Sequence, residues 1–313
     1  MQPLVSILIP VFNRANFIGE CIESALSQTY TNVEVVVVDN ASTDETWNIC
    51  KKYADIDQRV QIFRNKSNIG PVNNWICCAQ KAKGYFTKIL FSDDCLDANC
   101  LTEMLQPLND PDVAFVYCAA RIGKTREKST IAYAQPDSMR IDSIEYVNLV
   151  LSGMAPVSPG AVLLRKYDLI KNLHGTFPTS TAREFEKNGA GPDVMIMLLT
   201  ANNYPYVARI STPLVFFRAH NDSFTVANKN NYVVKGYRSA IAFFLKNTYG
   251  NKMLLSYLSY CWLQQIKSDH SWLNPADFIM EYECSGCKRQ ILLMMIYAVK
   301  HIVCKFFRRL YFA

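Results

Sequence analysis

Glycine and proline are scarce, at 12 and 13 of 313 residues, so long flexible linkers and collagen-like repeats are excluded. No run reaches the roughly 18 to 20 apolar residues that a membrane-spanning helix needs. The N-terminal MQPLVSILIP has neither the charged region nor the cleavage site of a secretory signal. With 50% hydrophobic and 19% charged residues, the composition predicts a globular protein with a large buried core.

Basic charge is concentrated at the C-terminal end. Residues 288–313 contain six Lys and Arg and no acid, whereas the first 287 residues carry 27 basic and 27 acidic side chains. A neutral body with a basic tail argues against a general nucleic-acid-binding protein.

The 11 cysteines are an odd number in a chain without a secretory signal, so we expect reduced, mostly buried thiols and a cytoplasmic location. Cys284-Ser-Gly-Cys287 has the spacing of a metal or redox pair. A zinc site needs a second pair of ligands, and no convincing one follows. Ordinary thiols near a turn are the favoured interpretation.

Strand and helix patterns alternate through the first hundred residues. Short β-branched runs are typical of buried strands, and apolar residues at helical spacing or turn and cap residues mark the helices between them. This rhythm predicts an α/β fold with a mainly parallel sheet and helices on both faces. The expected strands are 4–10, 33–38, 60–63 and 86–91, and the expected helices are 17–26, 42–53 (opened by a Ser42…Glu45 capping box) and 71–83.

The pattern is less regular after residue 105. Strands are expected at 113–119, 161–164 and 214–217, helices at 144–151 and 193–201, and an exposed hairpin or loop at 121–135. Helical patterns dominate from about residue 228 onward.

Polar residues follow each of the four early strands. They are Phe12-Asn13-Arg14, Asp39-Asn40, the segment from Asn65 to Gly70, and Ser92-Asp93-Asp94. Ligands of parallel α/β sheets bind beyond the carboxyl ends of the strands, so we expect the functional site at this edge.

The adjacent carboxylates of Asp93 and Asp94 repel each other unless a cation lies beside them. Mg²⁺ or Mn²⁺ bridging phosphate oxygens fits that need, and a helix N-cap is the structural alternative. Asp39 ends a buried strand, where it is placed either to accept a hydrogen bond from a nucleobase or to cap a turn.

Taken together, four segments resemble the family 2 glycosyltransferases of bacterial polysaccharide assembly, which have the GT-A fold. They are Pro10-Val-Phe-Asn-Arg14, Val38-Asp-Asn-Ala-Ser-Thr-Asp44, Asn68-Ile-Gly70 and Phe91-Ser-Asp-Asp94. The resemblance is dense over residues 3–105 and thinner to about 226. It implies a nucleotide-sugar-binding half (1–105), an acceptor-binding half (106–227) and a helical C-terminal extension (228–313).

The resemblance also implies roles for individual residues. Asp39 matches the acid that reads the uracil ring, Asp93 the acid near the ribose, and Asp94 the ligand of a Mn²⁺ or Mg²⁺ ion, with His220 as a tentative second metal ligand. Asp193 matches the general base of an inverting transfer, with a helix cap as the structural alternative and Glu184 and Glu186 as competitors. Pro10, Phe12, Arg14, Asn68 and Gly70 complete the implied nucleotide pocket, and Gly160 and Glu184 mark the implied acceptor region.

Three positions depart from the family pattern. Phe91 stands where many relatives have an acid, Asn40 replaces a second acid after Asp39, and Asn74-Trp75 falls where many relatives carry an Arg-Asn pair. We interpret these changes as variation within the family rather than as inactivation.

The last helical segment has a broad apolar stripe from Ile291 to Leu310 with Lys and Arg interleaved near its end. Such a helix suits an anionic membrane surface; packing on the core and a dimer contact are the alternatives. The sequence as a whole predicts an inverting, metal-dependent transferase that uses a UDP-sugar and a glycan or polyprenyl-diphosphate-linked acceptor, peripheral to the cytoplasmic membrane. The alternative is an inactive nucleotide-sugar-binding or scaffold protein. A sugar-phosphate nucleotidyltransferase is disfavoured, because Pro10–Arg14 contains no phosphate-binding glycine.

Overall fold

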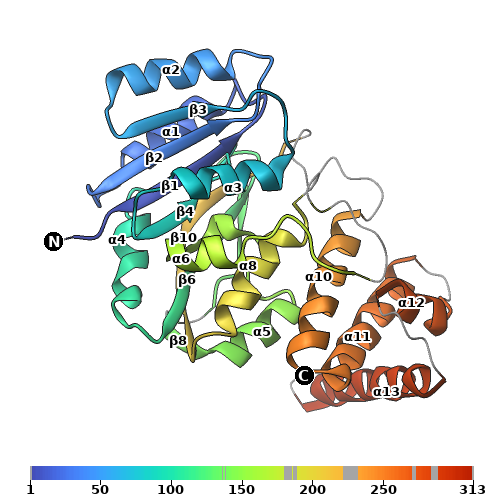
Figure 1. Cartoon of the computed structure of the whole chain (residues 1–313). Coiled ribbons are helices and arrows are strands. Elements are labelled where there is room, and N and C mark those ends of the chain that lie inside the picture. Colours follow the sequence, from blue (N-terminus) through green and yellow to red (C-terminus); the bar gives the residue numbers. More distant parts are fainter. Residues whose placement is uncertain are drawn as a thin grey trace. The chain divides into compact units, whose positions relative to one another are not determined.

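The computed structural model describes residues 2–135, 137, 139–179, 185, 189–220, 232–269, 273–282 and 288–311. It divides into two compact units (Figure 1). The first comprises Met1–Gly175 with Phe185–Asn230, and the second comprises Thr176–Glu184 with Asn231–Ala313. One sheet continues across residue 105, so the predicted nucleotide and acceptor halves belong to the same unit.

The first half of this unit is a parallel sheet with strand order β3-β2-β1-β4. β1 and β2 are buried along their whole length, as continuous β-branched runs predict for a sheet covered on both faces. The strands are β1 (Val5–Val11), β2 (Val33–Asp39), β3 (Val60–Arg64) and β4 (Phe86–Ile89), and the helices are α1 (Ile18–Leu26), α2 (Thr46–Ile56) and α3 (Pro71–Lys81).

The second half extends the sheet in the order β9-β6-β10-β5, and here antiparallel pairs enter. β6 and β7 form the hairpin expected at 121–135, and β8 pairs with β10. The sheet is therefore mixed beyond β4. The strands are β5 (Cys95–Leu96), β6 (Val113–Gly123), β7 (Ser129–Ala132), β8 (Met139–Asp142), β9 (Val162–Arg165) and β10 (Tyr206–Arg218).

Helices cover both faces of the sheet (Figure 1). On one face, side chains of α1, α2 and α4 (Cys100–Leu105) form a single apolar core with alternate residues of β1, β2 and β6. On the other, α3 lies against β1 and β2, and α8 (Pro192–Ala201) lies against β6 and α6 (Lys166–Asn172). The remaining elements are the short η1 (Gln106–Asn109), α5 (Ser143–Leu151) and η2 (Pro159–Ala161).

The strand directions determine which loops meet. β9 is antiparallel to both β4 and β6, and β10 is parallel to β6. β6 and β10 therefore run in the same direction as β1 and β4, and their carboxyl ends reach the same edge of the sheet. This brings the end of β10, at Arg218, to the edge where Asp39, Asp93 and Asp94 were predicted to gather.

The second unit is helical, as predicted. α11 packs against α10 and α13, and α12 contacts the other three. No helix within the described ranges has the length and apolar character needed to cross a bilayer. Its described helices are α10 (Tyr232–Thr248), α11 (Asn251–Asp269), α12 (Pro275–Tyr282) and α13 (Lys288–Tyr311).

The cysteines whose side chains are described are all free thiols, and all of them except Cys77 are buried. Burial raises the pKa of the Cys78 and Cys118 thiols, the latter to about 11. Neutral, buried thiols of this kind act as small apolar side chains. Cys284 and Cys287 lie outside the described residues.

Candidate functional site

Asp93 and Asp94 lie at the centre of a charged cluster between the end of β4 and the end of β10. Asp93 Oδ2 is 3.0 Å from His220 Nε2 and 3.6 Å from Arg14 Nε. Asp94 Oδ1 accepts a hydrogen bond of 2.9 Å from the backbone N–H of Arg218. The fold thus brings together four of the residues that the sequence singled out from three separate segments.

Arg218 is the residue that the sequence analysis missed in this cluster. Its Nε donates to the Asp93 carbonyl at 3.0 Å, and its guanidinium pairs with Glu20 at 2.6 Å while lying 5.3 Å from the centre of the Phe17 ring. Arg218 therefore fixes the backbone of the acid pair and adds positive charge beside it. Its place two residues before His220, in the same segment, was the signal that could have found it.

Asp94 is buried with few compensating contacts. Burial and the neighbouring charge of Asp93 raise the pKa of Asp94 well above its usual range, and the Arg218 hydrogen bond and the charges of Lys88 and Arg218 only partly oppose them. Lys88 is itself wholly buried in β4, where its ammonium group donates to the Gly160 carbonyl. Burial therefore favours the neutral form of the Asp94 carboxyl group unless further positive charge lies beside it.

Asp39 is fully inaccessible at the end of β2. Its two carboxylate oxygens each lie 3.2 Å from the Ser42 N–H, and Oδ2 pairs with Arg64 Nε at 2.9 Å. These contacts hold the Asp39 carboxylate in place inside the protein. Arg64, which the sequence analysis did not select, also lies 5.4 Å from the centre of the Trp47 ring.

The loop after β1 is held by the loop after β2. The N–H groups of Asn13 and Ala15 donate to Ser42 Oγ (2.9 Å) and Asp44 Oδ2 (3.1 Å), respectively. The predicted capping box is therefore wrong. α2 begins at Thr46, whose N–H donates to Asp44 Oδ1 at 3.1 Å, whereas Ser42 accepts from the loop after β1 instead. These bonds fix the backbone of Phe12–Arg14. Pro10 is buried within β1, whereas Phe12 is 38% exposed.

Four asparagine side chains tie the loop before α3 to the end of β2. Asn40 donates to Asn68 Oδ1 (2.9 Å) and accepts from Asn65 (3.0 Å), and Asn65 also donates to Asn74 (2.9 Å). Asn40 and Asn74, two of the departures from the family pattern, are therefore neutral members of one amide network. Gly70 ends this loop at φ +84°, a conformation that favours glycine.

We expect Asn74→Ala to lower the free energy of unfolding by about 1–3 kcal/mol, because it leaves buried partners unpaired. Asn74 Nδ2 donates to the Val38 carbonyl at 2.9 Å, and its oxygen accepts from Asn65. Asn73→Ala is the matched control, since Asn73 makes only an exposed bond to the Ile69 carbonyl. Thermal unfolding checks this: equal Tm values for the two variants would contradict a structural role for the network.

Asp193 lies at the first turn of α8, apart from the acid pair in the sequence. Its Oδ1 accepts from the N–H groups of Gly191 and Val194, both at 2.8 Å. These bonds serve the helix-cap role considered in the sequence analysis, and they also fix the orientation of the carboxylate.

The sequence analysis assigned Gly160 and Glu184 to the acceptor region. Gly160 is buried, and a Cβ there would come 3.0 Å from Phe217 Cε1. The space that glycine was expected to leave for a substrate is thus taken up by a ring of the protein. Glu184, the other residue of the implied acceptor region, and Glu186 lie outside the described residues.

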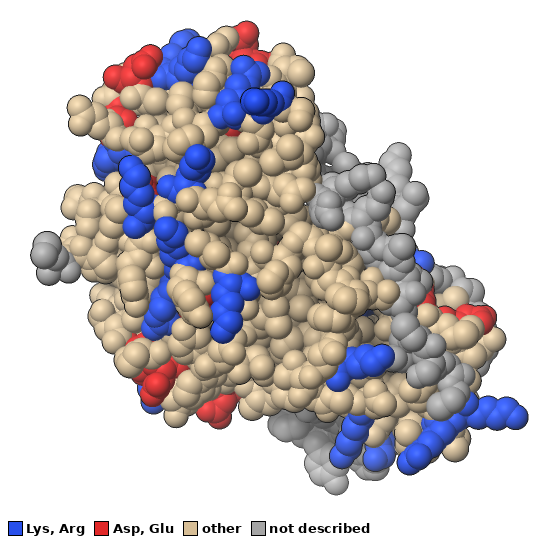
Figure 2. Space-filling model, in the orientation of Figure 1, with Lys and Arg blue, Asp and Glu red and all other residues tan. Residues whose placement is uncertain are grey.

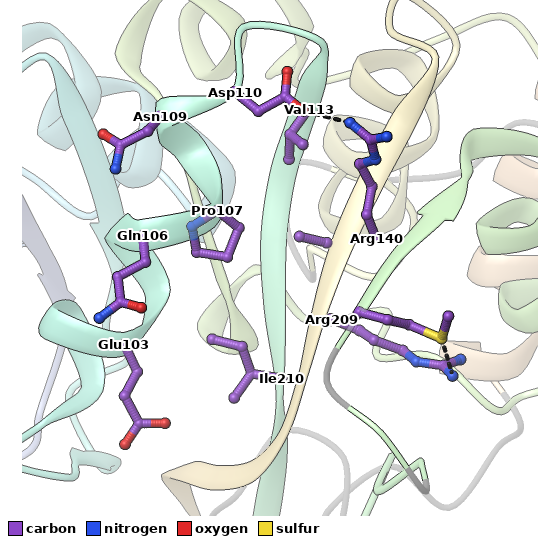
Figure 3. Close-up of a pocket in the computed structure, with 11 residues that line it drawn as sticks. Glu103, Gln106, Pro107, Asn109, Asp110, Val113, Arg140, Arg209 and Ile210 are labelled. Atoms are coloured by element: carbon purple, nitrogen blue, oxygen red, sulfur yellow. Dashed lines mark hydrogen bonds and ion pairs between the residues drawn. The ribbon is translucent and has the colours of Figure 1, made fainter.

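Two cavities of about 650 and 830 Å³ lie at the opposite edge of the sheet, near the start of β6 and the loop before β4. Figure 3 shows the smaller one, where Arg140 pairs with Asp110 and Arg209 contacts Met139. Neither cavity is lined by any of the predicted site residues. The site is therefore defined by converging polar groups at the carboxyl edge.

The fold is that of a GT-A glycosyltransferase. The model of glycosyl transferase family 2 matches residues 6–171. The chain therefore belongs to family 2.

Relatives and solved structures agree with this assignment. Glycosyltransferase GlyG of Streptococcus pneumoniae is 31% identical over 116 residues, which is 37% of this chain and 38% of that protein. An Escherichia coli relative, the UDP-Glc:alpha-D-GlcNAc-diphosphoundecaprenol beta-1,3-glucosyltransferase WfaP, is 31% identical over 48% of this chain and 59% of its own length. These matches span less than two thirds of either relative.

The crystal structure of S. aureus TarS 1–349 in complex with UDP-GlcNAc superposes with a TM-score of 0.70. It covers 96% of this chain and 89% of that one, at 16% sequence identity. At this identity the likeness establishes the fold alone.

Proposed function

We propose that this protein is an inverting glycosyltransferase that moves a sugar from a UDP-linked donor to a hydroxyl group of a glycan or lipid-linked oligosaccharide. The observation that carries the proposal is the convergence of Arg14, Asp93, Asp94 and His220 at the carboxyl edge that also bears Asp39. A nucleoside diphosphate brings a base, a ribose and strong negative charge, and this edge offers polar partners for each.

In the proposed reaction the acceptor oxygen attacks the anomeric carbon as the bond from that carbon to the diphosphate breaks. The acceptor proton passes to Asp193, and the bonding electrons leave with UDP. General-base assistance of this kind contributes about 10²- to 10⁴-fold. Arg14 and Arg218 supply fixed positive charge near the leaving group, which favours the developing diphosphate.

A divalent cation fits the acid pair. Within the described ranges no three His, Cys, Asp or Glu side chains group closely enough to hold a metal ion alone. Asp94, with Asp93 or His220, would hold Mg²⁺ or Mn²⁺ only if diphosphate oxygens and water completed the shell, the usual pattern for Mg²⁺. When bound, the metal would offset the charge of the leaving diphosphate.

The donor and acceptor classes are supported by the names of similar proteins. The TarS structures were solved with UDP-GlcNAc and with UDP, and the name of WfaP gives a UDP-glucose donor and a diphosphoundecaprenol-linked acceptor. We extend these classes to this chain as part of the proposal.

We also propose that α13 attaches the protein to the anionic surface of the cytoplasmic membrane. Leu292, Met295, Ile296 and Val299 are exposed at helical spacing, while Met294 and Ala298 on the other side are buried. Where Figure 1 draws α13, Figure 2 shows Lys and Arg without acidic residues. An apolar stripe flanked by basic residues is typical of a helix that lies in the membrane interface.

Nucleotide release from a panel of UDP-, GDP- and dTDP-sugars, with Mn²⁺ and with EDTA, tests the proposed function. We expect hydrolysis or transfer with one UDP-sugar only, lost in EDTA. Binding of UDP by calorimetry without turnover of any donor, with and without acceptor glycans, would instead identify the inactive scaffold. No binding of any nucleotide would contradict both.

A further inference from the structure

Two of the family departures contact each other. The rings of Phe91 and Trp75 have their centroids 5.5 Å apart at an angle of 55°. Phe91 stands where many relatives have an acid, and Trp75 belongs to the pair that replaces Arg-Asn. The two rings form an aromatic contact between the end of β4 and α3.

Phe91 belongs to the turn that carries Asp93 and Asp94. The Phe91 carbonyl accepts a 2.9 Å hydrogen bond from the N–H of Asp94. Phe91 is two residues before Asp93 in the chain, so its position sets the start of the turn that carries both carboxylates.

Trp75 packs against the backbone that precedes Asp193. The Trp75 ring, only 8% exposed, covers Gly189: a Cβ at Gly189 would lie 2.6 Å from Trp75 Cη2 and 3.0 Å from Cζ2. Gly189 has φ +76°, and its carbonyl faces the N–H of Asp193 at 3.4 Å. The ring therefore rests on the backbone that precedes the proposed base.

We propose that Trp75 and Phe91 are positioning residues that set the spacing between the Asp93–Asp94 turn and Asp193. The inference rests on the proposed function. The turn of Asp93 and Asp94 and the segment of Asp193 come from distant parts of the chain. Closely packed rings between them leave little room for either backbone segment to shift. A displacement of about 1 Å in such a site costs on the order of 10²-fold in rate.

The test is a double-mutant cycle of Gly189→Ala and Trp75→Phe. Gly189→Ala alone forces the ring and the loop apart, so we expect kcat for transfer to fall about 10- to 100-fold, with KM for the donor and Kd for UDP within about twofold. The shorter Phe ring removes the atoms that the new Cβ would meet. The double variant is therefore expected to recover much of the loss relative to Gly189→Ala.

Gly153→Ala is the matched control, because Gly153 has nearly the same φ (+74°) but no atom within 4 Å of an added Cβ. It carries the same backbone strain without the contact, and we expect its kcat to match wild type. Additive effects in the cycle, or equal kcat for Gly189→Ala and Gly153→Ala, would overturn the inference. Absence of turnover in wild type is a different outcome: it refutes the proposed function, and the inference with it.

Discussion

Asp193→Asn is expected to reduce sugar transfer by about 10²- to 10⁴-fold while leaving UDP binding unchanged. The amide retains the Oδ1 that accepts from Gly191 and Val194, so the first turn of α8 stays in place. It cannot take up the proton of the acceptor hydroxyl, which is the role of a general base. The measurement is kcat for transfer beside calorimetric Kd for UDP.

Asp168→Asn is the matched control for this loss. Asp168 is also a buried carboxylate, on α6, and its Oδ2 accepts from the Tyr204 hydroxyl at 3.0 Å. It belongs to the opposite edge, beside the larger cavity, so its transfer rate is expected to match wild type. If Asp193→Asn transferred as fast as Asp168→Asn, Asp193 would not be the base. Glu184 and Glu186 would then be the next candidates.

Asp94→Asn is expected to abolish metal-dependent turnover and, without metal, to stabilise the protein. The variant keeps an oxygen for the Arg218 N–H but loses the charge that attracts the cation. We expect at least a 10²-fold loss of activity in saturating Mn²⁺. Asp97→Asn is the control, because Asp97 is half-exposed, pairs with Arg126 and belongs to the same turn region; its response to Mn²⁺ is expected to match wild type.

The stability gain follows from the raised pKa of Asp94, which burial and the charge of Asp93 cause. A carboxyl whose pKa is higher in the folded than in the unfolded protein costs stability once it ionises, so stability falls as pH rises through its folded pKa. In EDTA at pH 8, Asp94→Asn should therefore have the higher Tm, and the gap should close towards pH 5. A lower Tm for Asp94→Asn at pH 8 would show that its charge is compensated in the folded state.

The strand and helix order of the first hundred residues was predictable because each element carries its own periodicity. The β-branched run Val33–Val38 forms a buried strand. α3 begins at Pro71, directly after Gly70, where proline is favoured as the first helical residue. The predicted capping box was wrong because Ser42, which has local cap chemistry, accepts a hydrogen bond from Asn13 of the neighbouring loop instead.

The asparagines show the limit of reading positions singly. In the sequence, Asn40 and Asn74 were each noted only as a neutral residue in place of a charged one. Their meaning depends on a shared partner, Asn65, which is 25 residues from one and nine from the other. No periodic signal in a sequence marks a side-chain network whose members come from different loops.

By itself, the sequence determined the alternation of elements, the sheet edge where polar residues collect and the family motifs, because these depend on local pattern and on the order of segments along the chain. Only the tertiary structure decided that Arg218 reaches the acid pair, that Arg64 pairs with Asp39, and that Trp75 contacts both Phe91 and the backbone at Gly189. The physical reason is the direction of β10: its parallel pairing with β6 carries Arg218 to a turn more than 120 residues earlier in the chain, and pairing at that separation leaves no local trace.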